Sequence, residues 1–174
     1  MLRTPRLRAT PPEDSVVEAL AACHERIRWF AALAQTLAVR VDAAAADRAE
    51  AAAAVIRYFT VALPLHAADE DLALAPRLRA LGPRVDDALA AMTAEHLDHA
   101  PLLAAVLAPC RAIVAAPTGP APRELGAAAD ALAAAFATHL AEEEAVVFPA
   151  VAVLPAHDLA AIRAEMFARR APPS

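Results

Sequence analysis

The sequence predicts an all-α protein: an antiparallel, up-down four-helix bundle with a short C-terminal helix. Hydrophobic residues make up 59% of the 174 residues and are largely alanine, the residue that most favours helix, while glycine occurs only 3 times. No stretch alternates cleanly between apolar and polar residues, so a β-sheet is not expected. Four long segments carry apolar residues at helical spacing, and short links rich in glycine or proline separate them.

The first helix is predicted to begin at Asp14 or Ser15, either of which can cap it, and to end near Arg40. Residues 1–13 carry three prolines and are expected to form a flexible arm before it. A second helix is predicted over residues 47–80, because Gly82-Pro83 breaks the chain directly afterwards.

The third helix is predicted over residues 84–115, where inward positions alternate in steps of four and three, the spacing of a bundle seam. A fourth helix over 123–153 follows the loop APTGPAP, and a shorter helix over 156–169 precedes the tail. The bundle domain is thus expected over residues 14–154, with the short helix and tail over 155–174. Prolines inside these helices are expected to bend or end them locally, at Pro64, Pro101, Pro109 and Pro149.

Composition excludes several classes of function. All 16 basic residues are arginine, so chemistry that needs a catalytic or phosphate-binding lysine is excluded. Ser15 and Ser174 are the only serines, and neither is placed to act as a nucleophile. The net charge of −5, without a basic stripe, argues against nucleic-acid binding. No catalytic residue is therefore predicted.

The cysteines and the N-terminal sequence favour a cytoplasmic location. Cys23 and Cys110 form no CxxC pair and are expected to be reduced and buried. Arginines near the N-terminus are not followed by an apolar run, so a secretory signal is not expected, and no uncharged run is long enough to cross a membrane. The bias towards arginine, alanine and proline suggests a GC-rich bacterial genome.

Polar residues lie on the inward seams of all four predicted helices. They are His24 on the first, His66 and Glu70 on the second, His96 and His99 on the third, and His139 and Glu143 on the fourth. One such residue is most simply a core histidine hydrogen-bonded to a carbonyl group. Several at one level are harder to explain in that way, because each buried polar group without a partner costs free energy. We therefore predict a metal site.

The same sequence phrase occurs twice. HAADEDLALAP starts at His66 and HLAEEEAVVFP at His139, each with a glutamate four residues after the histidine, on the same helical face. The separation from His24 to His66 is 42 residues, and that from His96 to His139 is 43. Two similar helix pairs would therefore meet in mid-bundle and hold a pair of metal ions between them.

Imidazole and carboxylate ligands without thiolate suit iron, and zinc or manganese are possible substitutes. Two iron ions take about twelve ligands in total. Four histidines, two bridging glutamates and an oxo or hydroxo bridge leave about two positions open, or about one if His99 also binds. An open position would admit O2 or another small diatomic ligand.

The order of these histidines and glutamates resembles the hemerythrin-like (HHE cation-binding) domain family over residues 14–154. This resemblance implies a four-helix bundle around a non-haem di-iron centre, with Glu70 and Glu143 as bridges. It also implies that His24, His66, His96 and His139 are terminal ligands. Oxygen-carrying hemerythrins have two histidines four apart on the third helix, whereas here position 100 is alanine and the second histidine is His99, three residues after the first.

The predicted function is O2 binding for carriage, storage or sensing, because no candidate acid, base or nucleophile exists beyond the ligands. One alternative is a di-iron enzyme acting on nitric oxide, peroxide or ferrous iron. Another is an iron-storage or iron-sensing regulatory protein. A monomer or homodimer is expected.

The remaining polar residues are assigned structural positions. His157 is expected on the surface, and Cys23 is expected to be packed in the core. The acids beside the bridging glutamates are expected to form mostly a solvated face, from which one could orient a ligating imidazole: Asp69, Asp71, Glu142 and Glu144. Apolar residues around the site are expected to keep water from the metals.

Overall fold

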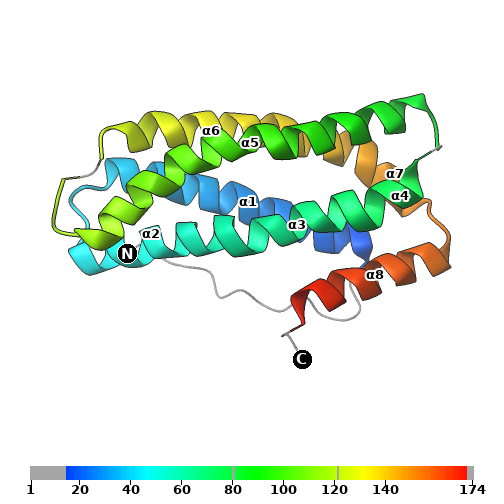
Figure 1. Cartoon of the computed structure of the whole chain (residues 1–174), viewed down its shortest axis with the longest axis horizontal. Coiled ribbons are helices and arrows are strands. Elements are labelled where there is room, and N and C mark those ends of the chain that lie inside the picture. The colour runs from blue at the N-terminus through cyan, green and yellow to red at the C-terminus, as the bar shows by residue number, and fades with distance from the viewer. Residues whose placement is uncertain (1–14, 80, 121, 172–174) are drawn as a thin grey trace.

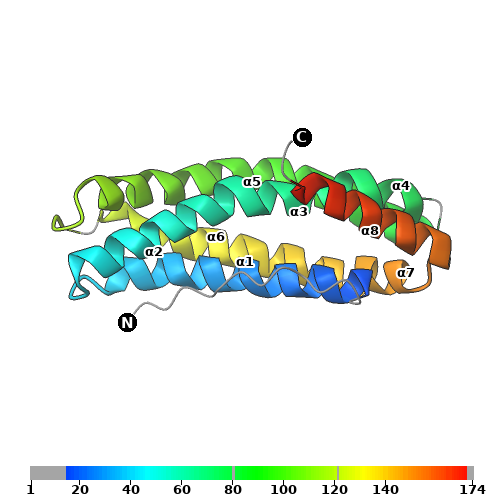
Figure 2. The ribbon, with the colours of Figure 1, turned by 90° about the horizontal axis from the view of Figure 1, so that it is seen from below.

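The computed structural model describes residues 15–79, 81–120 and 122–171. Four long helical segments lie side by side, and the links between them lie at alternating ends of the molecule (Figure 1). A shorter helix, α8 (Ala156–Arg170), lies along one side (Figure 2). No strand occurs among the described residues, and the predicted all-α class is confirmed. The arm expected over residues 1–13 lies outside the described part of the chain.

Helix α1 (Val16–Val39) begins with a capping box. The Ser15 hydroxyl accepts a hydrogen bond from the Glu18 backbone N–H at 3.1 Å, and the Ser15 N–H donates to the Glu18 carboxylate at 2.9 Å. These bonds satisfy two polar groups that a helix start otherwise leaves unpaired. The predicted cap and the predicted end near Arg40 are therefore confirmed.

The second long segment is continuous from Ala45 to Leu78, but two π-helical turns interrupt its α-helical pattern. In chain order its parts are α2 (Ala45–Arg57), η1 (Tyr58–Ala62), α3 (Leu63–Asp69), η2 (Glu70–Leu74) and α4 (Ala75–Leu78). Gly82 then adopts a φ of 145°, which favours glycine, and Pro83 starts the next helix.

Helix α5 (Pro83–Ala115) continues through both of its internal prolines. Pro101 and Pro109 were expected to bend or end their helix, and they do not end it. An internal proline costs about 3 kcal/mol in an isolated helix. Here α5 packs along α2 on one side and α6 on the other, and this burial outweighs the loss of one hydrogen bond at each proline.

The fourth segment consists of α6 (Glu124–Glu142), η3 (Glu143–Val147) and α7 (Phe148–Ala152). Each of the three π-turns ends two residues before a proline, at Pro64, Pro76 or Pro149. A proline cannot donate to the carbonyl four residues earlier, and its ring clashes with that carbonyl. The wider turn accommodates both effects, so the helix continues instead of ending.

The buried side chains form two apolar clusters, one at each end of the bundle. The first includes Leu37, Val55 and Ile113, and the second includes Leu20, Leu78 and Val151. Helix α1 packs against α2 and α6, and α5 packs against the same two helices, so all four segments enclose both clusters. Between the clusters lies a layer of polar side chains.

Helix α8 attaches to the bundle next to this polar layer, in contact with α1, α3 and η2. Ile162 and Met166 are buried against the bundle. At the end of α8, Arg169 and Arg170 donate to the two carboxylate oxygens of Asp69, at 2.7 Å and 2.5 Å. Asp69 is fully buried and is the last residue of α3.

Two helical segments, Ala45–Leu78 and Pro83–Ala115, are long and apolar enough to cross a membrane by length and composition, each with a mean hydropathy of 1.4. Core helices of alanine-rich bundles reach the same values. Both segments here carry histidine or glutamate side chains into the polar layer. Of the stretches with this hydropathy, 39% and 33%, respectively, are buried in the bundle.

Candidate metal centre

Six of the seven predicted ligands form one cluster in the polar layer between the two apolar clusters. His24 comes from α1, His66 and Glu70 from α3 and η2, His96 from α5, and His139 and Glu143 from α6 and η3. Five of these side chains are at most 5% exposed, and that of His96 is 12% exposed. Their ligand atoms form two groups, each within 4.8 Å: His24, His66, Glu70 and Glu143 in one, and His96, His139 and Glu143 in the other.

The repeated sequence phrase gives the same local structure twice. In each copy the histidine lies in the last turn of an α-helix. The glutamate four residues later is the first residue of a π-turn. Each π-turn is followed by the proline of the phrase, Pro76 or Pro149. The proline therefore helps to place a wide turn at the glutamate, and such turns are frequent at functional sites.

Each glutamate lies between two different imidazoles. One Glu70 oxygen is 3.3 Å from His66 Nε2, and its other oxygen is 3.3 Å from His96 Nε2. One Glu143 oxygen is 3.2 Å from His139 Nε2, and its other oxygen is 3.1 Å from His24 Nε2. Both carboxylates thus span the two ligand groups, as carboxylates shared by two metal ions would.

These short approaches are not hydrogen bonds. Among the described residues, nine buried side-chain polar atoms have no hydrogen-bond partner. Six of them belong to this cluster: His24 Nε2, both ring nitrogens of His66, one oxygen of Glu70 and both of Glu143. Such atoms are costly unless something satisfies them. The nitrogen and oxygen atoms of the cluster lie close together but do not have the geometry of hydrogen bonds. This set of atoms therefore fits cations placed between them.

Carboxylates outside the cluster hold three of the imidazoles by their second nitrogen. The Nδ1 atoms of His24, His96 and His139 lie 2.9 Å, 3.1 Å and 2.7 Å from carboxylate oxygens of Glu144, Asp71 and Glu95. A carboxylate at Nδ1 fixes the ring orientation and leaves Nε2 free to bind a metal.

The expectation of a mostly solvated acidic face is therefore corrected. Asp71 and Glu144 orient imidazoles, and Asp69 is buried by the arginines of α8, because the helices that flank these acids bring basic groups to them. Only Glu142 of the four is exposed. Glu95 was not singled out from the sequence, since its contact with His139 depends on how α5 and α6 face each other.

Burial and the neighbouring charges shift the pKa values of the cluster strongly. Burial opposes protonation of His24, but the carboxylates of Glu143 and Glu70 outweigh it and raise its pKa to about 9. Burial lowers the pKa of His66 to about 4, which keeps this imidazole neutral.

The two bridging carboxylates are shifted in opposite directions. Burial opposes ionisation of Glu70, but the surrounding imidazoles hold its pKa well below the ordinary value. Burial and the nearby Glu70 raise the pKa of Glu143. Two buried carboxylates this close resist ionising together unless positive charge lies between them. The electrostatics therefore favour cations at this position.

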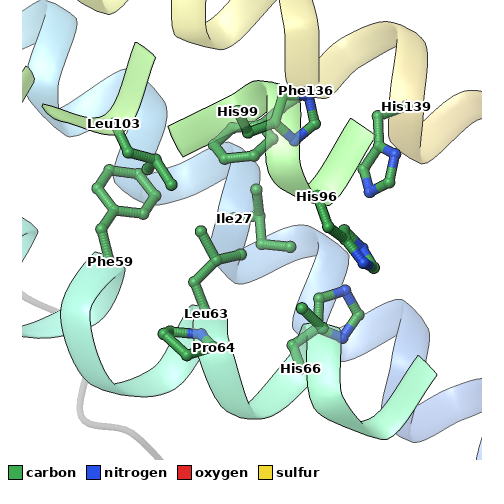
Figure 3. A pocket seen from close by; sticks show the side chains of 11 residues that line it. Ile27, Phe59, Leu63, Pro64, His66, His96, His99, Leu103, Phe136 and His139 are labelled. Atoms are coloured by element: carbon green, nitrogen blue, oxygen red, sulfur yellow. The ribbon is translucent and has the colours of Figure 1, made fainter. Parts of the chain in front are cut away.

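His99, the seventh predicted ligand, joins neither group of ligand atoms. Its ring contacts those of Phe136 and His139 edge to face, with 5.0 Å between centroids in each pair. With His66, His96 and His139 it lines a pocket of about 210 Å³ beside the cluster (Figure 3). Burial and the neighbouring His139 lower the pKa of His99.

The structural assignments outside the cluster are confirmed. The His157 side chain is 82% exposed, as expected of a surface residue. Cys23 and Cys110 are buried free thiols. Ile27, Phe59, Leu103 and Phe136 line the pocket beside the cluster (Figure 3).

Comparison with known proteins gives one family. The model of the hemerythrin HHE cation binding domain matches residues 15–151, which include all six clustered residues but not α8. No curated protein matches the chain.

Proposed function

Because the chain belongs to the hemerythrin HHE cation-binding family, we propose that it binds two iron ions and takes up O2 or a similar diatomic ligand beside them. The observation that carries this proposal is the arrangement of Glu70 and Glu143, each with its two oxygens near different imidazoles. The proposal includes the up-down antiparallel topology, a cytoplasmic location, and a monomer or homodimer.

The residues divide between the two ions by their distances. His24 and His66 would hold one ion, and His96 and His139 the other, while Glu70 and Glu143 would bind both. Glu144, Asp71 and Glu95 would keep three of the imidazoles oriented. This set contains no thiolate, which suits iron and also permits zinc or manganese.

When bound, a reduced iron pair with an open coordination position supplies the electrons needed to attach O2. The chain's own residues supply the surroundings for that chemistry. Phe59, Leu103 and Phe136 line the pocket with apolar surface, which limits the entry of water. No further acid, base or nucleophile lines the described pocket besides His99, whose pKa is lowered by burial. Reversible binding is therefore favoured over turnover.

Metal analysis combined with absorption spectroscopy tests the proposal. Protein produced with added iron is expected to contain two iron ions per chain, and its spectrum after reduction is expected to change reversibly with O2. A reduced centre that converts rapidly to ferric iron while consuming peroxide would support the enzymatic alternative. Fewer than two metal ions under every loading condition would contradict the di-iron assignment.

A further inference from the structure

The pocket beside the cluster is larger than a diatomic ligand requires. Its volume is about 210 Å³, and it is lined from α1, η1, α3, α5 and α6. His24, Glu70 and Glu143 do not line it, so this space is additional to the space between the ligand atoms. An apolar cavity of about 150 Å³ is enough to hold benzene, whereas a water molecule takes about 30 Å³ of liquid volume. The pocket therefore has room for a ring with a substituent.

Seven of the eleven residues that line the pocket are apolar. Besides its four histidines the walls consist of aliphatic and aromatic residues: Ile27, Phe59, Leu63, Pro64, Ala67, Leu103 and Phe136. Phe59 and Leu103 lie on the side away from the clustered histidines (Figure 3). A charged occupant would lose its hydration along this apolar part of the wall, which offers it no polar partner. The occupant is therefore expected to be neutral.

His99 is the lining side chain best placed to give that occupant a hydrogen bond. The Nε2 atoms of His66, His96 and His139 face the bridging carboxylates, and the Nδ1 atoms of His96 and His139 face Asp71 and Glu95. The remaining Nδ1, of His66, also lacks a hydrogen-bond partner, but it is fully buried and less accessible to an occupant. By contrast, the contacts of His99 within the described structure are ring packing, and no hydrogen bond occupies its nitrogens.

We propose that this pocket binds a small, uncharged organic molecule of about one ring with a single hydroxyl or carbonyl group, which His99 orients beside the metal pair. The inference rests on the proposed function for the metal pair and adds a second, organic ligand to it. The ring would pack against Phe59 and Phe136, whose own rings lie 6.0 Å apart between centroids, and the polar group would bond to the imidazole of His99.

Benzyl alcohol and toluene provide a matched pair of probes, because they differ only by the hydroxyl group. Binding of each to the iron-loaded protein is measured by calorimetric titration or by NMR. Benzyl alcohol is expected to bind more tightly than toluene. In His99→Phe, which keeps a ring, benzyl alcohol binding is expected to weaken by about tenfold, the loss of one net hydrogen bond, while toluene binding is kept.

Two filling variants test the position of the ligand. Leu103→Trp fills the pocket from α5, and Ala67→Leu fills it from α3, so a folding defect in one leaves the other informative. Each is expected to weaken binding of both probes more than tenfold. The control is Leu97→Trp, on the 75%-exposed side chain of α5, which is expected to bind both probes normally.

The outcomes separate this inference from the proposed function. If protein with two iron ions binds neither probe, or if both folded filling variants bind as the wild type does, the organic-ligand site is wrong and the metal centre is unaffected. Equal losses of both probes in His99→Phe would overturn the role of His99. If iron is absent but the probes bind and the filling variants abolish binding, the pocket stands and the di-iron function fails.

Discussion

Glu70 and Glu143 each begin a π-turn and lie within 3.3 Å of two different imidazoles. Three of their four carboxylate oxygens lack hydrogen-bond partners, so the protein by itself leaves these oxygens unsatisfied. A pair of cations would supply the missing partners. The stability of the polar layer and the binding of metal are therefore expected to depend on the same six side chains.

Substituting one of the six clustered residues with alanine should reduce the metal content of the protein. His66→Ala takes away half of the histidines of one group, and Glu143→Ala takes away an oxygen from each group. Both variants are expected to contain well below two metal ions per chain, as measured by metal analysis. His157→Ala, on the exposed histidine, is the matched control and should keep the wild-type content. Equal content in all three variants would show that the cluster is not the metal site.

Glu144, Asp71 and Glu95 contact the Nδ1 atoms of the imidazoles from outside the cluster. Substituting one of them should lower the affinity for metal more than the number of metal ions bound. In Glu95→Gln the His139 imidazole loses a charged partner at 2.7 Å. Loss of such an outer partner typically weakens metal binding by about 10- to 100-fold. Competition with a chromogenic chelator measures this change. Glu142→Gln removes the same charge from an exposed position beside Glu143 and should have little effect. If Glu95→Gln and Glu142→Gln weaken metal binding equally, the loss of a negative charge alone explains the effect.

The six clustered residues could be predicted from the sequence because each lies on an apolar helical face, and a buried polar group in such a position needs a partner. The contacts of Glu95, Asp71 and Glu144 could not be predicted in this way. These acids lie near the rim of the bundle, and their choice of imidazole depends on how neighbouring helices are rotated. The departure of His99 from the ligand groups has the same cause, since a step of three turns its ring towards the pocket.

Helix α8 lies outside the residues that match the family, yet it packs next to the cluster of histidines and glutamates. Its last residues neutralise Asp69, which directly precedes Glu70 in the chain. Helix α8 therefore fixes the junction between α3, which contains His66, and η2, which begins with Glu70. The sequence predicted this helix over nearly its full length, but its place of attachment could not be read from apolar spacing alone.

The contact between α8 and Asp69 should contribute strongly to stability. In Arg169→Ala/Arg170→Ala the buried Asp69 carboxylate loses both partners, which typically costs about 3–5 kcal/mol. Denaturant unfolding is expected to show this loss as a lower midpoint. Adding Asp69→Asn to the double variant removes the unpaired charge and should restore part of the stability, whereas a defect of packing alone would not be restored.

A control on the same helix supports this reading. Arg163→Ala removes an arginine of α8 that makes no ion pair in the described structure. It is expected to leave the unfolding midpoint nearly unchanged. A loss as large as that of the double variant would mean that any truncation in α8 destabilises the protein equally.

The protein as a whole consists of two apolar clusters with a polar layer between them. Four helical segments cross that layer, so it affects the packing of the entire bundle. The number of helices and their bounds were predictable to within a few residues, because Gly82-Pro83 and the loop after Ala115 interrupt strong helical patterns. The π-turns were not, since they depend on tertiary packing that keeps a helix continuous across a proline.

Removal of the metal should destabilise the whole bundle. Ligand at about 1,000 times its dissociation constant stabilises a protein by about 4 kcal/mol. For a chain of this size that corresponds to a melting temperature higher by roughly 8–16 °C. A chelator is therefore expected to lower the melting temperature of the iron-loaded protein by that amount, measured by circular dichroism.

The metal-poor His66→Ala variant should show a much smaller shift with the same chelator. A wild-type melting temperature that the chelator does not change would contradict the predicted coupling. A large loss of helix content at room temperature after chelation would favour the regulatory alternative, in which metal loading controls folding.

The π-turns at Glu70 and Glu143 also restrict how this chain can vary in length. Each residue advances an α-helix by about 100° around its axis, and a π-turn accommodates one residue more than an α-turn does. Deleting one residue from η2 would be absorbed by closing the wide turn, whereas deleting one from α3 would rotate everything after it by that angle relative to the first half of the segment. Leu74 and Leu78, now fully buried, would swing away from the interior. Shortening α3 would thus misalign a whole half of the bundle, far beyond the metal site itself.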